Sequence, residues 1–331
     1  MNSISNVEVL SSTKVGHYCS NGFRNVNYSF SDFTLYEKIL KSNLHVSFSK
    51  PTSSEPWLSK PSFRPQLRTC EYVVVSILMS ELYLSLAYRI SQEDLTKSWV
   101  KQVKLKNTPQ IVSDFIQPIS VARIHSVKLS PIQMESSFEI AIGETEIELT
   151  IAHSNTSEKE IDDCILSEAY NDFACFLQNL NLNFYKVGYK SLNHLIHDIK
   201  TEPDLMIASA QIRQIATFNR HLGIGSHFIR TMDIASFILV SSQIIQVLLY
   251  AMDDSKIVKA DDLWVRGLEI NYPAPMSIDS MKEYVKCKSL KTVRYQGKAW
   301  KMADMRVTLG NIQAKFDVAY QDDGILTDID E

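Results

Sequence analysis

Glycine is scarce in this 331-residue chain, and that scarcity argues against one large class of sites. The sequence has 10 glycines, about 3% where average proteins have roughly 7%. It contains neither the G-x-G-x-x-G fingerprint of dinucleotide-binding domains nor the G-x-x-x-x-G-K-[ST] phosphate loop. We therefore expect no cofactor that is held by a glycine-rich loop.

Cysteine and net charge are low as well. The 5 cysteines are widely spaced and form no C-x-x-C pair, which predicts reduced thiols in a cytoplasmic protein, with no zinc site and no disulfide framework. The 34 Lys and Arg nearly balance the 38 Asp and Glu, for a net charge of -4. Because positive charge is not in excess, the sequence does not favour nucleic acid as a partner.

Long hydrophobic runs are almost absent, with one exception. The N-terminus has no apolar core of the signal-peptide type. Residues 234–252 contain no charge and approach the length that spans a membrane, but they include Ser and Gln and have acidic flanks. With 45% hydrophobic residues overall, the composition is that of a globular protein, and we expect a buried helix here, not membrane insertion.

What the chain does contain is an internal repeat. The segment LRTCEYVVVSILMSELYLSLAY (67–88) matches IRTMDIASFILVSSQIIQVLLY (229–250). Three further pairs of segments match in the same order along the two copies and at nearly the same spacing: 22–33 with 188–199, 98–106 with 263–271, and 138–153 with 305–320. A tandem duplication explains this regularity better than chance does.

Each copy has the same predicted layout, which indicates an α+β protein. Two strand-like segments precede one long apolar helix, and three alternating segments follow it. Gly-Glu (143–144) and Gly-Asn (310–311) suit the hairpin turns. A long central helix wrapped by an antiparallel sheet is the plan of a hot-dog domain, so we predict a tandem double hot-dog. The predicted parts are an N-terminal repeat (1–153), a connecting helical linker (154–185) and a C-terminal repeat (186–331).

The motif R-T-x-[ED] opens the predicted central helix in both copies, as Arg68 to Glu71 and as Arg230 to Asp233. In one interpretation Thr69 and Thr231 are N-caps and the acids favour the positive end of the helix dipole. Capping leaves the arginines unexplained, because a cation is disfavoured at a helix start. In the other interpretation the set is functional.

The functional interpretation assigns each residue type a task. Buried carboxylates, Glu71 or Asp233, suit a general base. The arginines, Arg68 and Arg230, suit a phosphate or a developing oxyanion, helped by free N–H groups at the helix start. Thr69 and Thr231 would contact the substrate.

A loop before the second helix, residues 219–228, differs between the copies. It carries His221 and His227, either of which could act as acid or base near neutral pH. Gly225 in the same loop could let a ligand approach the backbone. Because the first copy lacks these residues, we expect only one of the two possible sites, one in each copy, to be used. No spacing of ligands predicts a metal.

The segment NGFRNVNYSFSDF, the helix openings LRTCEY and IRTMDI, and the overall size resemble the AvrD family of bacterial proteins over nearly the whole chain. That resemblance implies secondary metabolite biosynthesis of the syringolide type, in which a β-ketoacyl thioester is joined to a sugar. The organisation is also similar to that of AfsA-type butyrolactone (butenolide) synthases, which take an acid from the first repeat and an Arg from the second. By position these are Glu71 and Arg230.

These observations favour an acyltransferase that condenses a (β-keto)acyl thioester with a hydroxyl of a sugar or a glycerol- or triose-type acceptor. The substrate would be acyl-CoA or an acyl group on acyl carrier protein, with no further cofactor, and a homodimer is compatible with the sequence. The alternatives are a hot-dog dehydratase or thioesterase that uses Asp233 with His221, and a non-catalytic acyl-binding module. The chain lacks the H-x-x-G-x-P-x-x-P-G run of hot-dog dehydratases.

Overall fold

The computed structural model describes residues 24, 26–36, 38–48, 67–106, 116–154, 176–215, 221–228, 230–252, 263–277, 281–295 and 297–321. The first half contributes six strands: β1 (Val26–Tyr36), β2 (Ile39–Phe48), β3 (Trp99–Lys106), β4 (Ile116–Ser130), β5 (Gln133–Ile142) and β6 (Thr145–Ser154). The second half contributes β7 (Asn193–Glu202), β8 (Ile207–Ile215), β9 (Trp264–Asn271), β10 (Met281–Tyr295), β11 (Lys298–Leu309) and β12 (Ile312–Gln321). The helical segments are α2 (Thr69–Tyr88), α3 (Gln92–Thr96), η4 (Leu180–Leu182), η5 (Phe184–Gly188), α5 (Tyr189–Ser191), η6 (Pro203–Leu205) and α6 (Ile234–Met252).

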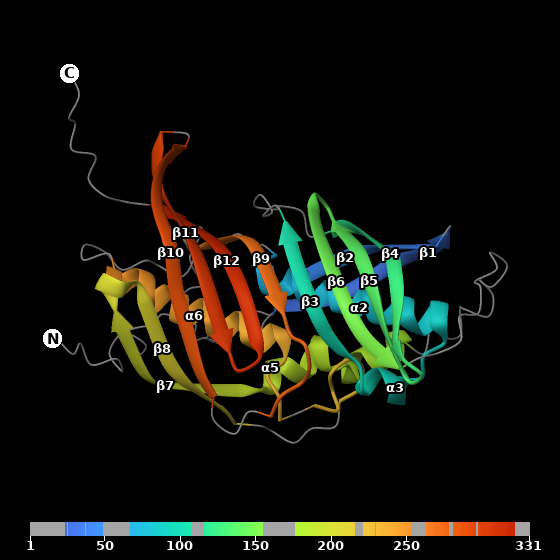
Figure 1. The fold of residues 1–331 in the computed structure, drawn as a ribbon. Helices are drawn as coiled ribbons and strands as arrows, with labels where there is room; N and C mark the ends of the chain where they lie inside the picture. Colours follow the sequence, from blue (N-terminus) through green and yellow to red (C-terminus); the bar gives the residue numbers. More distant parts are fainter. Residues whose placement is uncertain are drawn as a thin grey trace.

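All twelve strands form one antiparallel sheet in the order β1-β2-β4-β5-β6-β3-β9-β12-β11-β10-β8-β7 (Figure 1). The second half has the equivalent strands in the opposite order, so the two halves mirror each other about the β3–β9 junction. At this junction Lys104 lies opposite Glu269. Gly143 and Gly310 occupy the predicted hairpin turns with φ of 56° and 58°. The predicted duplication therefore agrees with the strand order.

One long helix lies on the inner face of each half, α2 against β4, β5 and β6, and α6 against β7, β8 and β10 (Figure 1). This confirms the predicted hot-dog plan, in which a sheet encloses a central helix. By length and composition alone both helices could cross a membrane, but 83% and 78% of the apolar stretches, Thr69–Leu86 and Ile234–Met252, are buried inside the protein. Their apolar surfaces are explained by packing on several sides.

The edge strands approach each other at their first residues. The Arg24 guanidinium, just before β1, donates to the Leu192 carbonyl (3.2 Å) and to Asn193 Oδ1 (2.7 Å). In the mirror-related contact, the Lys190 ammonium donates to the Val26 carbonyl. The sheet thus curves far enough that residues next to its two edges are bonded to each other.

The segment between the two strand sets is helical in its described part. Residues 176–179 are α-helical, and η4, η5 and α5 follow. The rest of the expected connecting helix lies outside the described residues. The predicted division at 153 and 186 remains a prediction, with β6 ending near the first limit and β7 beginning after the second.

Three buried glutamates make the stability of this fold depend on pH. Burial raises the pKa of Glu71 and Glu283 to about 8 and that of Glu81 to about 7. An unfolded glutamate titrates near pH 4.3, so between that value and about 8 the folded chain holds more protons than the unfolded chain. The stabilisation is fully present below about pH 4.3 and is lost as pH rises through the folded values.

We therefore expect the free energy of unfolding to fall from about pH 5 to about pH 8, by at most about 1.4 kcal/mol per pH unit for each group. Urea denaturation across this range measures the slope. Glu283→Gln, which replaces a neutral acid by a neutral amide, should make the slope shallower. An unchanged slope in this variant would contradict the assignment for Glu283.

Candidate functional site

The two long helices meet at their first turns. The Cys70 thiol at the start of α2 lies 3.9 Å from the Ala235 carbonyl oxygen at the start of α6. The sequence predicted that these helix starts would share one site. Their contact brings the Glu71 and Asp233 ends of the two helices into one buried region.

The R-T-x-[ED] motif adopts a different backbone in each copy, and the predicted threonine caps are wrong. In the first copy the helix already begins at Thr69, and the Arg68 backbone N–H donates to Glu71 Oε2 (2.9 Å). In the second copy the helix begins later, at Ile234, and Asp233 Oδ1 accepts the Ser236 N–H (3.0 Å). The Thr231 hydroxyl donates to the Phe228 carbonyl instead (2.7 Å). Each acid, not the threonine, therefore accepts a backbone N–H at its helix start.

Glu71 is completely buried, and its charged neighbour is a lysine. Burial raises the pKa of Glu71 to about 8, although its backbone hydrogen bond and the nearby Lys190 ammonium favour the charged form. Burial also lowers the pKa of Lys190 to about 8, against the attraction of Glu71. With its pKa raised to about 8 by burial, the Glu71 carboxyl can give or take a proton near neutral pH.

Four tyrosines surround Glu71, Lys190 and the start of α6. The Lys190 ammonium lies 5.3 Å from the centre of the Tyr28 ring. Burial raises the pKa of each phenol, so all four hydroxyls stay protonated near neutral pH and can serve as hydrogen-bond donors. They are Tyr28, Tyr185, Tyr189 and Tyr272. With Glu71, Cys70, Lys190 and Asp233 they form what we call the helix-start cluster.

Asp233 occupies the second-copy end of the cluster. It is 8% exposed, and burial raises the pKa of its carboxyl, opposed by hydrogen bonds to Ser236. Its charge in turn raises the pKa of the Tyr185 and Tyr272 phenols. The cluster thus has two buried acids, one from each half, with only the Glu71 end holding a lysine.

The predicted arginines are placed differently from each other. Arg68 is half-buried beside the start of α2, whereas Arg230 is exposed at the surface. The structure therefore places the partly buried Lys190 where its charge acts on Glu71 and leaves the Arg230 side chain at the surface. That position suits contact with an anionic group arriving from solvent.

The loop before α6 lies against the first half of the chain. The Gly225 N–H donates to the Ser98 carbonyl (2.8 Å) and the His227 N–H to the Thr96 carbonyl (3.0 Å). Gly225 has φ +79°, and a side chain there would begin 3.7 Å from the Tyr185 ring, so this loop borders the cluster. The His227 side chain is exposed.

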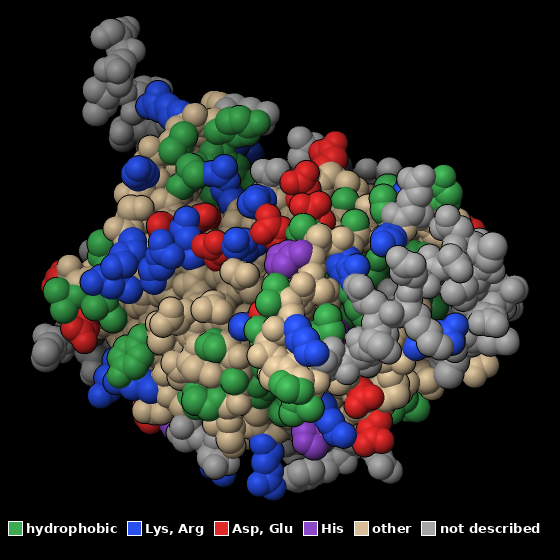
Figure 2. Space-filling model, turned by 45° about the vertical axis from the view of Figure 1, so that its right-hand side comes forward, with side chains coloured by type: hydrophobic (Ala, Val, Ile, Leu, Met, Phe, Trp, Pro, Cys, Tyr) green, Lys and Arg blue, Asp and Glu red, His purple; other side chains and the backbone are tan. Residues whose placement is uncertain are grey.

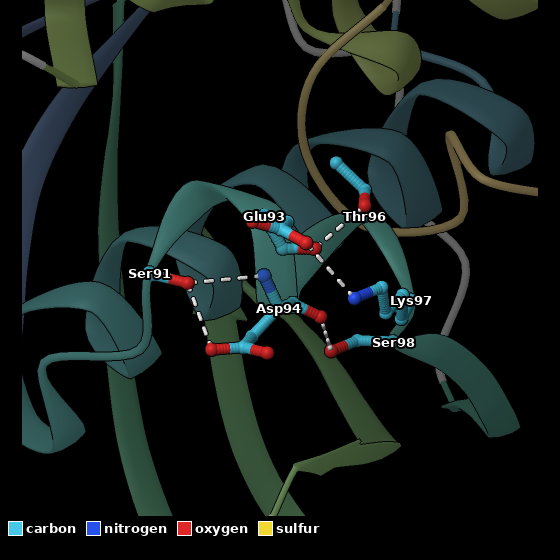
Figure 3. Close-up of polar contacts among 6 residues, drawn as sticks. All are labelled: Ser91, Glu93, Asp94, Thr96, Lys97 and Ser98. Atoms are coloured by element: carbon cyan, nitrogen blue, oxygen red, sulfur yellow. Dashed lines mark hydrogen bonds and ion pairs between the residues drawn. The ribbon is translucent and has the colours of Figure 1, made fainter.

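The segment whose carbonyls accept these hydrogen bonds from the loop is held in place by hydrogen bonds of its own (Figure 3). Ser91 Oγ caps α3 by accepting the Asp94 N–H (3.1 Å), and Ser98 Oγ donates to the Asp94 carbonyl (3.1 Å). The Lys97 ammonium pairs with Glu93 (3.1 Å). The carbonyls that receive the loop are therefore fixed by the end of a short, capped helix.

His221 packs against the linker instead of the cluster. Its ring lies 6.1 Å from the Phe184 ring in an edge-on arrangement and is close to Gly188. Burial lowers the pKa of His221, which keeps the imidazole neutral near pH 7. Among the described residues, no group of His, Cys, Asp and Glu is arranged to hold a metal ion.

Two charged residues were not predicted, although each had a signal in the sequence. Lys190 occupies the place in GYKSLNHLIHDI that Arg24 occupies in GFRNVNYSFSDF, so the repeat alignment paired two cations that bridge the sheet edges. Glu81 is the other acid in the apolar run of α2. It is buried and accepts hydrogen bonds from the Ile224 N–H (2.9 Å) and the Asn183 side-chain amide (2.8 Å).

The fold is similar to those of several solved structures, including the three that follow. An acyl-ACP thioesterase from Bacteroides thetaiotaomicron is 8% identical with a TM-score of 0.42, and the match covers 86% of this chain and 99% of that chain. A 12:0-ACP thioesterase from Umbellularia californica is 8% identical with a TM-score of 0.41, covering 86% and 94%. A tesB protein of Mycobacterium avium subspecies paratuberculosis is 8% identical with a TM-score of 0.39, covering 88% and 96%. Similarities this weak assign no activity to this chain.

No curated protein matches the sequence. The family described as Pseudomonas avirulence D protein (AvrD) matches residues 4–321, which is nearly the whole chain and includes both helix starts. The chain therefore belongs to the AvrD family.

Proposed function

We propose that the chain is a tandem double hot-dog acyltransferase that moves a β-ketoacyl group from a thioester to a hydroxyl of a sugar or glycerol-type acceptor. The observation that supports it best is the fully buried Glu71 carboxyl at the start of α2, whose charged form is favoured by the partly buried Lys190 ammonium. Transfer of this kind needs a base for the hydroxyl proton and a cation for the oxyanion. Glu71 and Lys190 would provide these two groups, and the chemistry is what resemblance to the AvrD family implies.

In the proposed reaction the Glu71 carboxylate takes the proton of the acceptor hydroxyl. The oxygen attacks the thioester carbonyl, and the Lys190 ammonium, together with free N–H groups at the start of α2, stabilises the tetrahedral oxyanion. The carbon–sulfur bond then breaks, and the Glu71 carboxyl returns its proton to the leaving thiolate. The products are an ester and a free thiol.

The remaining predicted residues fit supporting tasks. Arg68 and the exposed Arg230 would hold anionic groups of the carrier or the acceptor, and the cluster tyrosines would donate hydrogen bonds to substrate oxygens. Thr69, Thr231 and Gly225 border the same helix starts. The acyl donor would be acyl-CoA or acyl carrier protein in the cytoplasm.

Mass spectrometry of products tests this function. The protein is mixed with β-ketoacyl thioesters and a panel of sugars and triose phosphates, and we expect an acyl ester whose formation releases thiol only when acceptor is present. Thiol release without acceptor would show hydrolysis, and loss of water from a 3-hydroxyacyl thioester would show dehydration. Tight acyl binding without turnover would show a binding module. Each of these three outcomes contradicts transfer.

A further inference from the structure

A groove crosses the outer face of the sheet at the junction of the two halves. Its volume is about 770 Å³, within the range typical of small-molecule sites. Its walls come from β3, β4, β5 and β6 of the first half and from β9, β11 and β12 of the second. The helix-start cluster lies on the other side of the sheet, where α2 and α6 pack. The groove is therefore a feature separate from the proposed catalytic site.

The floor of the groove is a row of uncharged hydrogen-bonding side chains that are directly opposite one another across four strands. In strand order they are Gln102, Asn271, Gln313 and Thr308. Each alternates with buried core positions, such as Val103 and Ile270, so the row faces outward. At about 4.8 Å between strands the row is about 14 Å long. Amide and hydroxyl groups in such a row can pair with the hydroxyls of a polyol.

In the neighbouring row two cations, Lys315 on β12 and Arg306 on β11, line the groove, and Lys286 on β10 lies directly opposite Arg306 just beyond the lining. The row continues on β9 with the lining carboxylate Glu269, opposite Lys315, and on the first-half side the lining residue Glu135 pairs with Lys101. Like charges directly opposite each other destabilise a sheet. Asp317 pairs with Lys315 (3.0 Å) and Asp304 with Arg306 (3.6 Å), but within the described part of the chain no carboxylate pairs with Lys286.

Further cations extend this charge along β10, although the chain as a whole has a net charge of -4. Lys282 and Lys288 are exposed there, as is Lys286. Figure 2 shows Lys and Arg side chains gathered below the projecting β10–β11 hairpin. The cationic end of this row, at Arg306 and Lys286, adjoins the neutral polar row and suits a ligand with an anionic end and a hydroxylated body.

We propose that this groove binds a phosphate ester of a sugar. The phosphate lies between Arg306 and Lys286, where the guanidinium fork fits two phosphate oxygens. The sugar hydroxyls lie along the row from Thr308 to Gln102. The ligand is either a free sugar phosphate or the ribose phosphate of a nucleotide, since both present the same two groups.

Isothermal titration calorimetry at low salt tests the proposal. The probes are ribose phosphate, adenosine monophosphate, ribose and inorganic phosphate. We expect ribose phosphate to bind at least about tenfold more tightly than ribose or inorganic phosphate, because it alone joins both rows. Tighter binding of adenosine monophosphate than of ribose phosphate identifies a nucleotide ligand, and equal binding identifies a free sugar phosphate.

Three surface variants distinguish specific binding in the groove from non-specific attraction of anions. Arg306→Gln should weaken ribose phosphate binding roughly tenfold or more, and Asn271→Ala should weaken it less while leaving inorganic phosphate unaffected. Arg213→Gln is the matched control, an exposed arginine on β8 outside the groove lining, and should change binding less than about twofold. Equal losses in both arginine variants, or equal binding of ribose phosphate and inorganic phosphate, would overturn the proposal.

Discussion

Glu71→Gln is expected to lower the rate of acyl transfer by about two to four orders of magnitude while the protein stays folded. Removing a positioned general base has effects of this size, because the acceptor hydroxyl must then attack without losing its proton to the enzyme. Gln has nearly the shape of a protonated Glu, and burial keeps Glu71 largely protonated near neutral pH. The folded structure should therefore tolerate the change, and the loss should appear in the rate of ester formation.

The companion variant is Lys190→Met, which keeps the length of the side chain and removes its charge. It should lower transfer by about two to three orders of magnitude, since it removes a charge aimed at the oxyanion. Its loss of the hydrogen bond to the Val26 carbonyl should also reduce stability, so circular dichroism must accompany the kinetics.

The control for both is Glu283→Gln, which changes a buried glutamate with a similarly raised pKa in the second half. Glu283 faces Ser241 in the middle of α6, away from the helix starts, and transfer should stay within about twofold of the unsubstituted rate. Full transfer activity in Glu71→Gln would rule out the proposed mechanism. A loss as large in Glu283→Gln would show that any buried glutamate matters, through structure alone.

Gly223→Ala is expected to destabilise the fold by about 3 kcal/mol or more. Gly223 has φ +86°, a backbone conformation that a residue with a Cβ adopts only with strain. The new methyl group would also lie 2.6 Å from Glu81 Oε2 and would overlap the Asn183 side-chain nitrogen. These groups are buried and bonded to each other, so they cannot move without breaking the hydrogen bonds that hold the loop.

Gly225→Ala provides a matched control two residues away. Gly225 also has a positive φ, 79°, but a methyl group there would begin 3.7 Å from the Tyr185 ring, an ordinary contact. Only the backbone strain applies, and we expect about 1 kcal/mol. Urea denaturation of both variants measures the difference. Equal destabilisation would show that contact with Glu81 and Asn183 adds nothing to the strain.

The periodicity of the sequence predicted the long helices, the strands and the hairpins, and the structure confirms them. The reason is local: a helix buried on several sides must be apolar along its whole length, and a strand with one buried face must alternate. Matched blocks at a constant spacing likewise predicted that the strand order would repeat. Even the meeting of the two helix starts follows from this symmetry, because it puts equivalent ends at the centre.

The contents of the site depended on contacts that no local pattern encodes. Equivalent motifs begin their helices at different residues, Thr69 and Ile234, so Arg68 stays half-buried while Arg230 reaches the surface. Lys190 comes near Glu71 because the sheet curves until residues beside its two edges are hydrogen-bonded to each other.

The sequence by itself therefore determined a duplicated sheet-and-helix protein with acids at two helix starts. Only the tertiary structure decided that the charge of Lys190 acts on Glu71. The physical reason is that the curvature of the sheet fixes which side chains lose their water, and the free energy of a buried charge depends on neighbours more than a hundred residues away.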